Sequence, residues 1–96
     1  MNYTFHPHAE RELEEIQNYY HSILQELGEK FRRDLLMTVA RIRKFPEGWQ
    51  RLSGTVRRCE LSDFPYAIIY RRKPDHIRIL AVPHHRRKPE YWKYRS

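Results

Sequence analysis

Two apolar stripes with helical spacing, with Gly28 between them, restrict the possible folds more than any other feature of this chain. Between residues 9 and 27, and again between residues 31 and 45, apolar side chains recur mostly in steps of three and four, the period of a helix with one buried face. Gly28 stands where a left-handed helix C-cap favours glycine, and Pro46 ends the second stripe. So short a connection predicts an antiparallel helix hairpin whose apolar faces need a further layer to cover them.

Strand signals lie on both sides of the hairpin. Tyr3 and Phe5 alternate with polar residues, the period of a short strand. Turn-forming residues separate three later strand-like runs, which are residues 56–61, 66–72 and 77–82. The middle run contains the continuous apolar segment Ala67–Tyr70, which indicates a central strand. Trp49 and Leu52 are expected in the link before these strands, as an apolar plug between helices and sheet.

The sequence therefore predicts an α+β fold with the element order β-α-α-β-β-β. The helix hairpin packs on a twisted antiparallel sheet, and a short basic C-terminal tail follows. Ninety-six residues without an internal repeat or a linker are expected to form one domain spanning residues 1–96. The lone Cys59, the lack of an apolar run of about 20 residues and the lack of a signal-peptide pattern predict a cytoplasmic protein with no membrane contact.

Charge is distributed unevenly along the chain, whose formal net charge is +7. Residues 1–50 contain seven Lys and Arg against eight Asp and Glu, whereas residues 51–96 contain twelve against four. The first half is therefore close to neutral and the second half carries a net charge of +8. This asymmetry predicts an anionic partner, either nucleic acid or an acidic protein.

The sequence gives little support to covalent or metal chemistry. Cys59 lies in a predicted strand without a fixed partner, and Ser53, Ser62 and Ser96 lie in turns or at the terminus. One cysteine and the pairs His6/His8 and His84/His85 do not reproduce the spacing of a structural zinc site. The three glycines are isolated, so they form no phosphate-binding loop. We expect no metal and no other cofactor.

The segment from residue 81 to residue 92 combines two imidazoles, three cations and two large aromatic rings. Cations bind phosphates, imidazoles transfer protons near neutral pH and aromatic rings stack on bases, so the segment suits a polyanion. In the strand 56–61, alternation places Arg58 and Glu60 on the exposed face if Cys59 lies inside. The predicted contacts to the target or to nucleic acid are Arg57, Arg58, His84, Arg86, Arg87, Lys88 and Trp92.

Two alternatives remain open for the same segment. In the structural one, Tyr91 and Trp92 cover the open face of the sheet and the histidines merely end a strand. In the catalytic one, the protein cleaves RNA through attack by the ribose 2′-OH, which needs a base, an acid and cations for the phosphorane charge. The side chains that divide these roles are His84 or His85, Tyr91, Arg58 and Arg87.

Short motifs in a fixed order carry a family resemblance over almost the whole chain. They are Phe5-His6-Pro7 with Ala9 and Leu13, Tyr19-Tyr20, Leu27-Gly28 with Phe31, Ile42, Pro46, Arg57-Arg58, Leu61, Phe64-Pro65-Tyr66 with Ile68 and Tyr70, Ile79, Ala81-Val82, His84, Arg87-Lys88-Pro89 and Tyr91-Trp92. With them the chain resembles the toxins of bacterial type II toxin–antitoxin systems in the RelE/ParE superfamily, and within it the ParE-like plasmid-stabilisation branch. The resemblance implies the same fold of a helix hairpin on a sheet.

The resemblance also implies partners and a function. A cognate antitoxin, acidic in the part that wraps the toxin, neutralises such proteins, and characterised ParE-like members inhibit growth by binding DNA gyrase without being nucleases. RelE-like members instead cut messenger RNA in the ribosome. Glu60 and Ala67 stand where RelE-like nucleases carry further basic residues, which favours a protein that is not an enzyme.

Some ribonuclease relatives use a glutamate and a histidine in this site. The endoribonuclease alternative therefore has Glu60, His85 and Tyr91 as catalytic residues and Arg58 as the cation, with the ribosome and mRNA as partners. A third alternative is an inactive relative that only binds the antitoxin.

Overall fold

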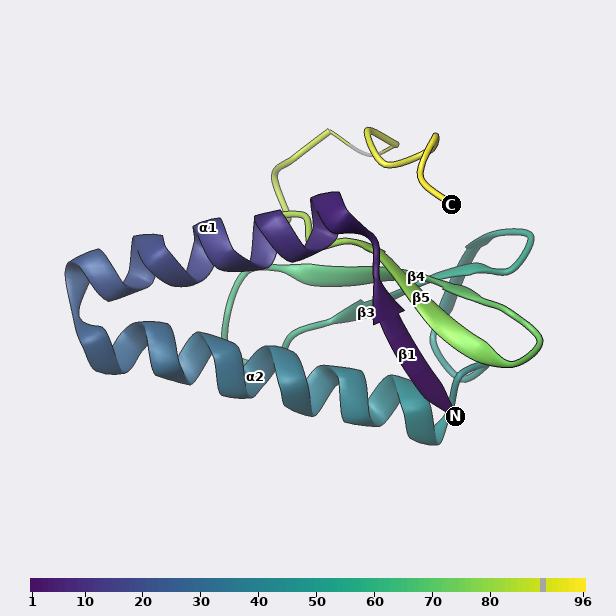
Figure 1. The fold of residues 1–96 in the computed structure, drawn as a ribbon, viewed down its shortest axis with the longest axis horizontal. Helices are drawn as coiled ribbons and strands as arrows, with labels where there is room; N and C mark the ends of the chain where they lie inside the picture. Colours follow the sequence, from purple (N-terminus) through teal and green to yellow (C-terminus); the bar gives the residue numbers. More distant parts are fainter. Residues whose placement is uncertain (89) are drawn as a thin grey trace.

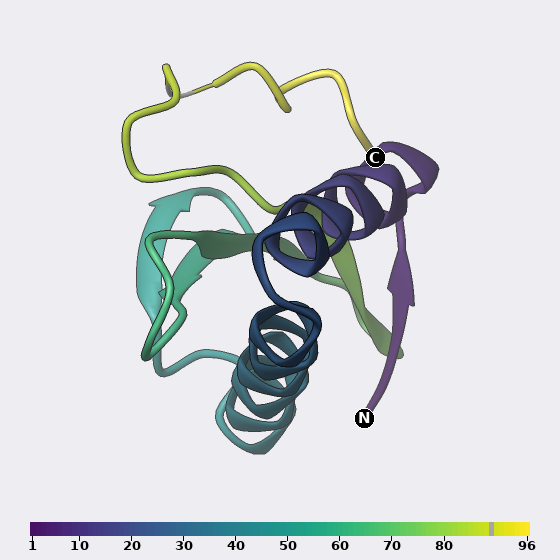
Figure 2. The ribbon, with the colours of Figure 1, turned by 90° about the vertical axis from the view of Figure 1, so that its left-hand side faces the viewer.

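The computed structural model describes residues 1–88 and 90–96; Pro89, part of the C-terminal motif above, lies outside the described residues. The elements in chain order are β1 (Asn2–Phe5), α1 (Pro7–Ile23), α2 (Gln25–Lys44), β2 (Gln50–Ser53), β3 (Val56–Glu60), β4 (Ala67–Arg72) and β5 (His76–Ala81). The predicted α+β fold with a helix hairpin on a twisted sheet is confirmed. In Figures 1 and 2 the C-terminal segment, residues 83–88 and 90–96, lies beside α1 on the side away from α2.

The five strands form one mixed sheet in the order β1-β5-β4-β3-β2. β1 pairs with β5 in parallel, and the other neighbours are antiparallel, so the sheet is mixed and not antiparallel throughout as predicted. The chain can pair β1 with β5 in parallel because the whole helix hairpin and three strands lie between them. β4 is the middle strand and Ala67, Ile68, Ile69 and Tyr70 are fully buried, which confirms the central strand predicted from this apolar run.

β2 is an additional strand in what the sequence predicted to be a link. It pairs with β3 across a tight turn in which Gly54 has φ +52°, a left-handed conformation that suits glycine. All four of its residues are exposed, so the run lacks the apolar alternation that marks a half-buried strand. Trp49 packs against the core as predicted, and its indole Nε1 donates to the Arg41 carbonyl at 3.3 Å.

The helix hairpin turns four residues earlier than predicted. α1 ends at Ile23, the extended Leu24 (φ −161°, ψ 127°) is the whole connection, and Gly28 lies inside the first turns of α2. The prediction of Gly28 as a helix C-cap was therefore wrong. A Cβ at Gly28 would lie 1.9 Å from His21 Cδ2, so glycine is needed here because the two helices approach closely.

Two apolar clusters lie on opposite faces of the sheet. The larger one joins both helices to β3, β4 and β5, and its fully buried side chains include Phe31, Leu35, Ile42, Ile68, Tyr70, Ile77 and Ile79. The smaller one joins Trp92 to Val56, Ile69, Leu80 and Ala81 on the other face. We call that second face, away from the helices, the open face. Among the described residues, no helix is long and apolar enough to cross a membrane.

Candidate functional site

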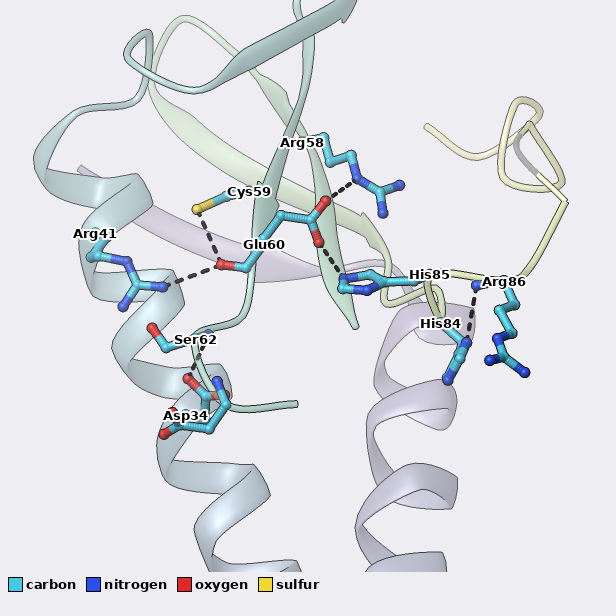
Figure 3. A network of polar contacts seen from close by, with 10 residues as sticks. Asp34, Arg41, Arg58, Cys59, Glu60, Ser62, His84, His85 and Arg86 are labelled. Atoms are coloured by element: carbon cyan, nitrogen blue, oxygen red, sulfur yellow. Dashed lines mark hydrogen bonds and ion pairs between the residues drawn. The ribbon is translucent and has the colours of Figure 1, made fainter. Parts of the chain in front are cut away.

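A carboxylate at the end of β3 joins two basic side chains that lie far apart in the sequence. Arg58 Nε donates to Glu60 Oε1 at 2.6 Å, and His85 Nε2 lies 2.5 Å from Glu60 Oε2. Figure 3 shows Glu60 between the other two side chains. All three remain partly exposed, Glu60 by 49%. These residues, here called the Glu60 cluster, are therefore accessible to a ligand.

The C-terminal segment reaches Glu60 because it continues to pair with the chain just before β4. Tyr66 and His84 form an isolated antiparallel bridge, and the His85 amide donates to the Pro65 carbonyl at 2.9 Å. The His84 ring lies edge-on to the Tyr66 ring, with centroids 5.0 Å apart. The two adjacent histidines thus point in different directions, and only His85 joins the Glu60 carboxylate.

The contacts of Glu60 also shift its ionisation. Partial burial acts to raise the pKa of this carboxyl, but the hydrogen bonds and positive charges of Arg58 and His85 together outweigh it. The pKa of Glu60 is therefore lower than usual, and the side chain is a carboxylate at neutral pH. With Nε2 directed at Glu60, Nδ1 is the ring nitrogen of His85 that is left to face a ligand.

Tyr91, the third residue of the endoribonuclease alternative, lies in a different set of contacts. Its hydroxyl donates to Glu12 Oε1 at 3.2 Å, and the guanidinium carbons of Arg87 and Arg95 lie 3.9 and 5.0 Å from the ring centroid. Burial, and after it the negative charge of Glu12, raises the pKa of the Tyr91 phenol. Within the described residues, Tyr91 makes no hydrogen bond to the Glu60 cluster.

Glu12 on α1 holds the C-terminal segment in place, a role that the sequence analysis missed. Its Oε1 accepts the Val82 amide at 2.9 Å, and its Oε2 pairs with Arg95 Nη2 at 2.9 Å. The signal in the sequence was its position three residues after Ala9 and four before Ile16, which places Glu12 at the edge of the buried helical stripe. An acidic side chain at that edge contacts the segment that packs against it, here the C-terminal segment.

The predicted target contacts lie on different surfaces. Arg57 shares the helix side of the sheet with Cys59, and its Nη1 donates to the Trp49 carbonyl at 2.8 Å. Trp92 is only 7% exposed and belongs to the smaller apolar cluster, which agrees with the structural alternative for this ring. Among the predicted target contacts, the exposed cations of the C-terminal segment are Arg86, Arg87 and Lys88.

A groove in the helix layer is a second candidate site, with a volume of about 700 Å³. α2 forms one wall and the loop between β3 and β4 the other. The Asp34 carboxylate fixes this loop by accepting the amides of Ser62 and Asp63 at 3.1 and 2.8 Å, the first of which is drawn in Figure 3. The apolar lining residues are Leu27, Met37 and Phe64, and the cationic ones are Lys30, Arg33 and Arg41. We call this the helix-side groove.

The described residues of neither site provide a reactive thiol or a cluster of metal ligands. Cys59 is buried against the larger apolar cluster, and burial raises the pKa of its thiol, which disfavours the nucleophilic thiolate. Among residues 1–88 and 90–96, no three His, Cys, Asp or Glu side chains lie together as a metal site requires. The Glu60 cluster is instead suited to proton transfer or to ion pairing, and the helix-side groove to a peptide.

Comparison with known proteins assigns the family. The family model of the ParE toxin of the type II toxin–antitoxin system parDE matches residues 3–89. This chain therefore belongs to the ParE toxin family, and the predicted resemblance to the ParE-like branch is confirmed.

A solved structure described as the chromosomal ParDE TA system from P. aeruginosa has a similar fold, with a TM-score of 0.76. The two chains are 24% identical, and the match covers 88% of this chain and 95% of that one. A comparison with curated proteins found no match.

Proposed function

We propose that this chain is the toxin of a type II toxin–antitoxin module, that a cognate antitoxin neutralises it, and that it inhibits growth by binding DNA gyrase. The observation that carries the proposal of an antitoxin is the helix-side groove, whose lining combines three apolar side chains with three cations and two aspartates. Leu27, Met37 and Phe64 offer contact to apolar side chains, while Lys30, Arg33 and Arg41 attract carboxylates. An amphipathic acidic segment complements both.

A pair of neighbouring residues on α2 tests this docking site. Met37 lines the groove and is 62% exposed, whereas Leu36 is 40% exposed and is not among the groove residues. We expect Met37→Glu to weaken the affinity for the antitoxin encoded beside this gene by at least about tenfold, because it places a charge against the apolar and acidic segment. Leu36→Glu is the matched control and should change the affinity less than about threefold.

Calorimetric titration of the antitoxin into each variant measures both affinities. Equal affinities for wild type and Met37→Glu would place the antitoxin on another surface. No binding of the antitoxin by the wild-type chain would remove the neutralisation proposal itself.

The basic second half of the chain supports the proposal of a gyrase contact. Residues 51–96 carry a net charge of +8, and Arg86, Arg87 and Lys88 are exposed next to the Glu60 cluster. Supercoiling of relaxed plasmid by purified gyrase is expected to fall as this protein is added and to recover when the antitoxin is added. Supercoiling that is unaffected by an excess of the protein would exclude gyrase as the target.

The Glu60 cluster favours a ribosome-dependent mRNA endoribonuclease as a second candidate function. A carboxylate 2.5 Å from an imidazole nitrogen orients that ring, and the two groups have the arrangement of a general acid–base pair. Arg58 adjoins the pair as the cation. Against this candidate, Tyr91 lies with Glu12 instead, and each lost transition-state donor reduces the rate by about 10² to 10³.

Primer extension on translated messages discriminates between the two functions. A nuclease produces new 5′ ends in the coding region, and His85→Ala should abolish them while binding of the antitoxin is retained. Intact messages together with growth arrest would exclude the nuclease and favour the gyrase proposal. Intact messages, active gyrase and unaffected growth, with the antitoxin still bound, would indicate the third alternative, an inactive relative.

A further inference from the structure

Three arginines from three neighbouring strands line up diagonally across the open face. Ile69 belongs to the cluster on the open face, and side chains alternate along a strand, so Arg71 points to that face as well. Arg71 on β4 is the direct partner of Arg78 on β5. Arg58 on β3 is opposite Ile69, two residues from Arg71. We call Arg58, Arg71 and Arg78 the arginine ladder.

The spacing of the ladder follows from sheet geometry. Directly paired residues on adjacent strands have Cβ atoms about 5 Å apart, and diagonal neighbours are about 7 to 8 Å apart. The Cβ atoms of Arg58 and Arg78 therefore both lie within about 8 Å of that of Arg71. The Arg58 guanidinium is turned toward Glu60 and the Arg78 guanidinium toward β1. Like charges directly opposite each other are unfavourable in a sheet, so the positions of Arg71 and Arg78 favour binding of an anion.

The described residues supply few anions to the ladder. Arg58 is paired with Glu60, which it shares with His85. Arg78 Nη1 donates only to neutral oxygens, the Thr4 hydroxyl at 3.1 Å and the Phe5 carbonyl at 3.0 Å. Arg71 makes no side-chain hydrogen bond or ion pair to any described residue. Hydrogen bonds hold the Arg78 guanidinium but not that of Arg71, and neither group has a carboxylate partner among the described residues.

The chemistry of the surrounding face selects the kind of partner. Ile69, Leu80 and Ala81 at its centre are fully buried beneath Trp92, so they give a partner no apolar contact. Interfaces between proteins have an apolar core, whereas interfaces with DNA are polar and strongly positive. Trp92 is buried and Tyr91 lies between two guanidinium groups, so neither ring at this centre is free to stack on the bases of a single strand.

From these observations we infer that the arginine ladder binds the phosphodiester backbone of duplex DNA, without base specificity. Arg71 and Arg78 supply guanidinium groups that have no carboxylate partner among the described residues, and a phosphate bound beside them balances their charge. Arg58 extends the contact across a third strand. This inference does not depend on gyrase or on the antitoxin, because it concerns a different face from the helix-side groove.

Fluorescence anisotropy of a labelled DNA duplex of about 20 base pairs tests the inference, with the full chain titrated at several salt concentrations. The wild-type chain should bind with an affinity whose logarithm falls with the logarithm of salt concentration, with a slope of about −2 or steeper. Arg71→Gln should weaken binding at low salt and make this slope shallower by about 1. Because Arg71 makes no side-chain hydrogen bond or ion pair to the described residues, the variant should melt no earlier than wild type.

Arg32→Gln is the matched control, since it removes the same charge from an exposed side chain in the helix layer. It should leave the slope within about 0.3 of wild type. Equal losses in the two variants would overturn the inference in favour of a general effect of net charge. It would also be overturned by tighter binding of a single-stranded RNA of the same length, or by displacement of the DNA by polyglutamate at an equal concentration of charge.

Discussion

Glu12 is the residue on which the C-terminal segment depends. Its side chain, only 16% exposed, accepts the Val82 amide and the Tyr91 hydroxyl and pairs with Arg95. Glu12→Ala removes all of these contacts and leaves partners without a counterpart, so we expect the free energy of unfolding to fall by about 2 to 4 kcal/mol. Glu14→Ala, at an exposed position of the same helix, should change it by less than about 0.5 kcal/mol. Equilibrium denaturation in urea measures both.

Glu60 predicts a pH dependence with a definite sign. Its folded-state pKa is lowered by Arg58 and His85, so its contribution to stability is present above the unfolded pKa of about 4.3 and is lost as the pH falls through the folded value. Because Glu60 is half exposed, solvent screening keeps this contribution below about 1 kcal/mol. Wild type should be more stable than Glu60→Gln at pH 7 and should lose that advantage as the pH falls below about 4.3 and through the lowered folded-state pKa. An advantage that grows on acidification would contradict the assignment.

At the scale of the elements, the close approach of α1 and α2 at Gly28 gives the clearest prediction. Gly28→Ala places a methyl group 1.9 Å from His21 Cδ2, so the ring or the helix must move, and we expect a loss of about 1 to 3 kcal/mol. In a His21→Ala background the methyl group has room. The same substitution should then become neutral or stabilise by up to about 1 kcal/mol, because alanine favours helix. Thermal unfolding of the four proteins gives this double-mutant cycle.

The C-terminal segment has no regular secondary structure, but its Trp92 covers part of the open face of the sheet. Trp92 is 7% exposed over Ile69 and Leu80, whereas Tyr94 is 90% exposed. We expect Trp92→Ala to lower the free energy of unfolding by about 3 to 5 kcal/mol and Tyr94→Ala by less than about 0.5 kcal/mol. A small effect of Trp92→Ala in urea denaturation would show that the segment does not cover the open face in solution.

At the scale of the whole molecule, periodicity in the sequence predicted the elements with a large buried face. Each helix buries one face and the segment Ala67–Tyr70 buries both faces of its strand, so the apolar pattern of the sequence predicted these elements. β2 was not predicted because all of its residues are exposed and only its pairing with β3 defines it. Gly28 was wrongly predicted to be a helix C-cap because glycine is required there by the close approach to His21 and not by the local backbone conformation.

The candidate sites were predictable only in part, for the same reason. The family resemblance grouped Arg58, Glu60 and His85 with Tyr91 in one candidate catalytic site. The contact of the first three depends on the C-terminal segment pairing with the chain before β4, whereas Tyr91 lies with Glu12. Glu12 was missed because the groups that it binds lie on another element. Arg71 and Arg78 were missed because only the register between β4 and β5 brings them together. Periodicity reports which face a residue occupies, whereas a site also requires the register between strands.

Growth of cells that express this protein, with and without the antitoxin encoded beside its gene, tests the central claim most directly. If the chain is a toxin that its antitoxin neutralises, induction of the chain alone should arrest growth, and coexpression of the antitoxin should restore it. Normal growth on induction of the folded chain alone, or an arrest that the antitoxin does not relieve, would contradict the claim.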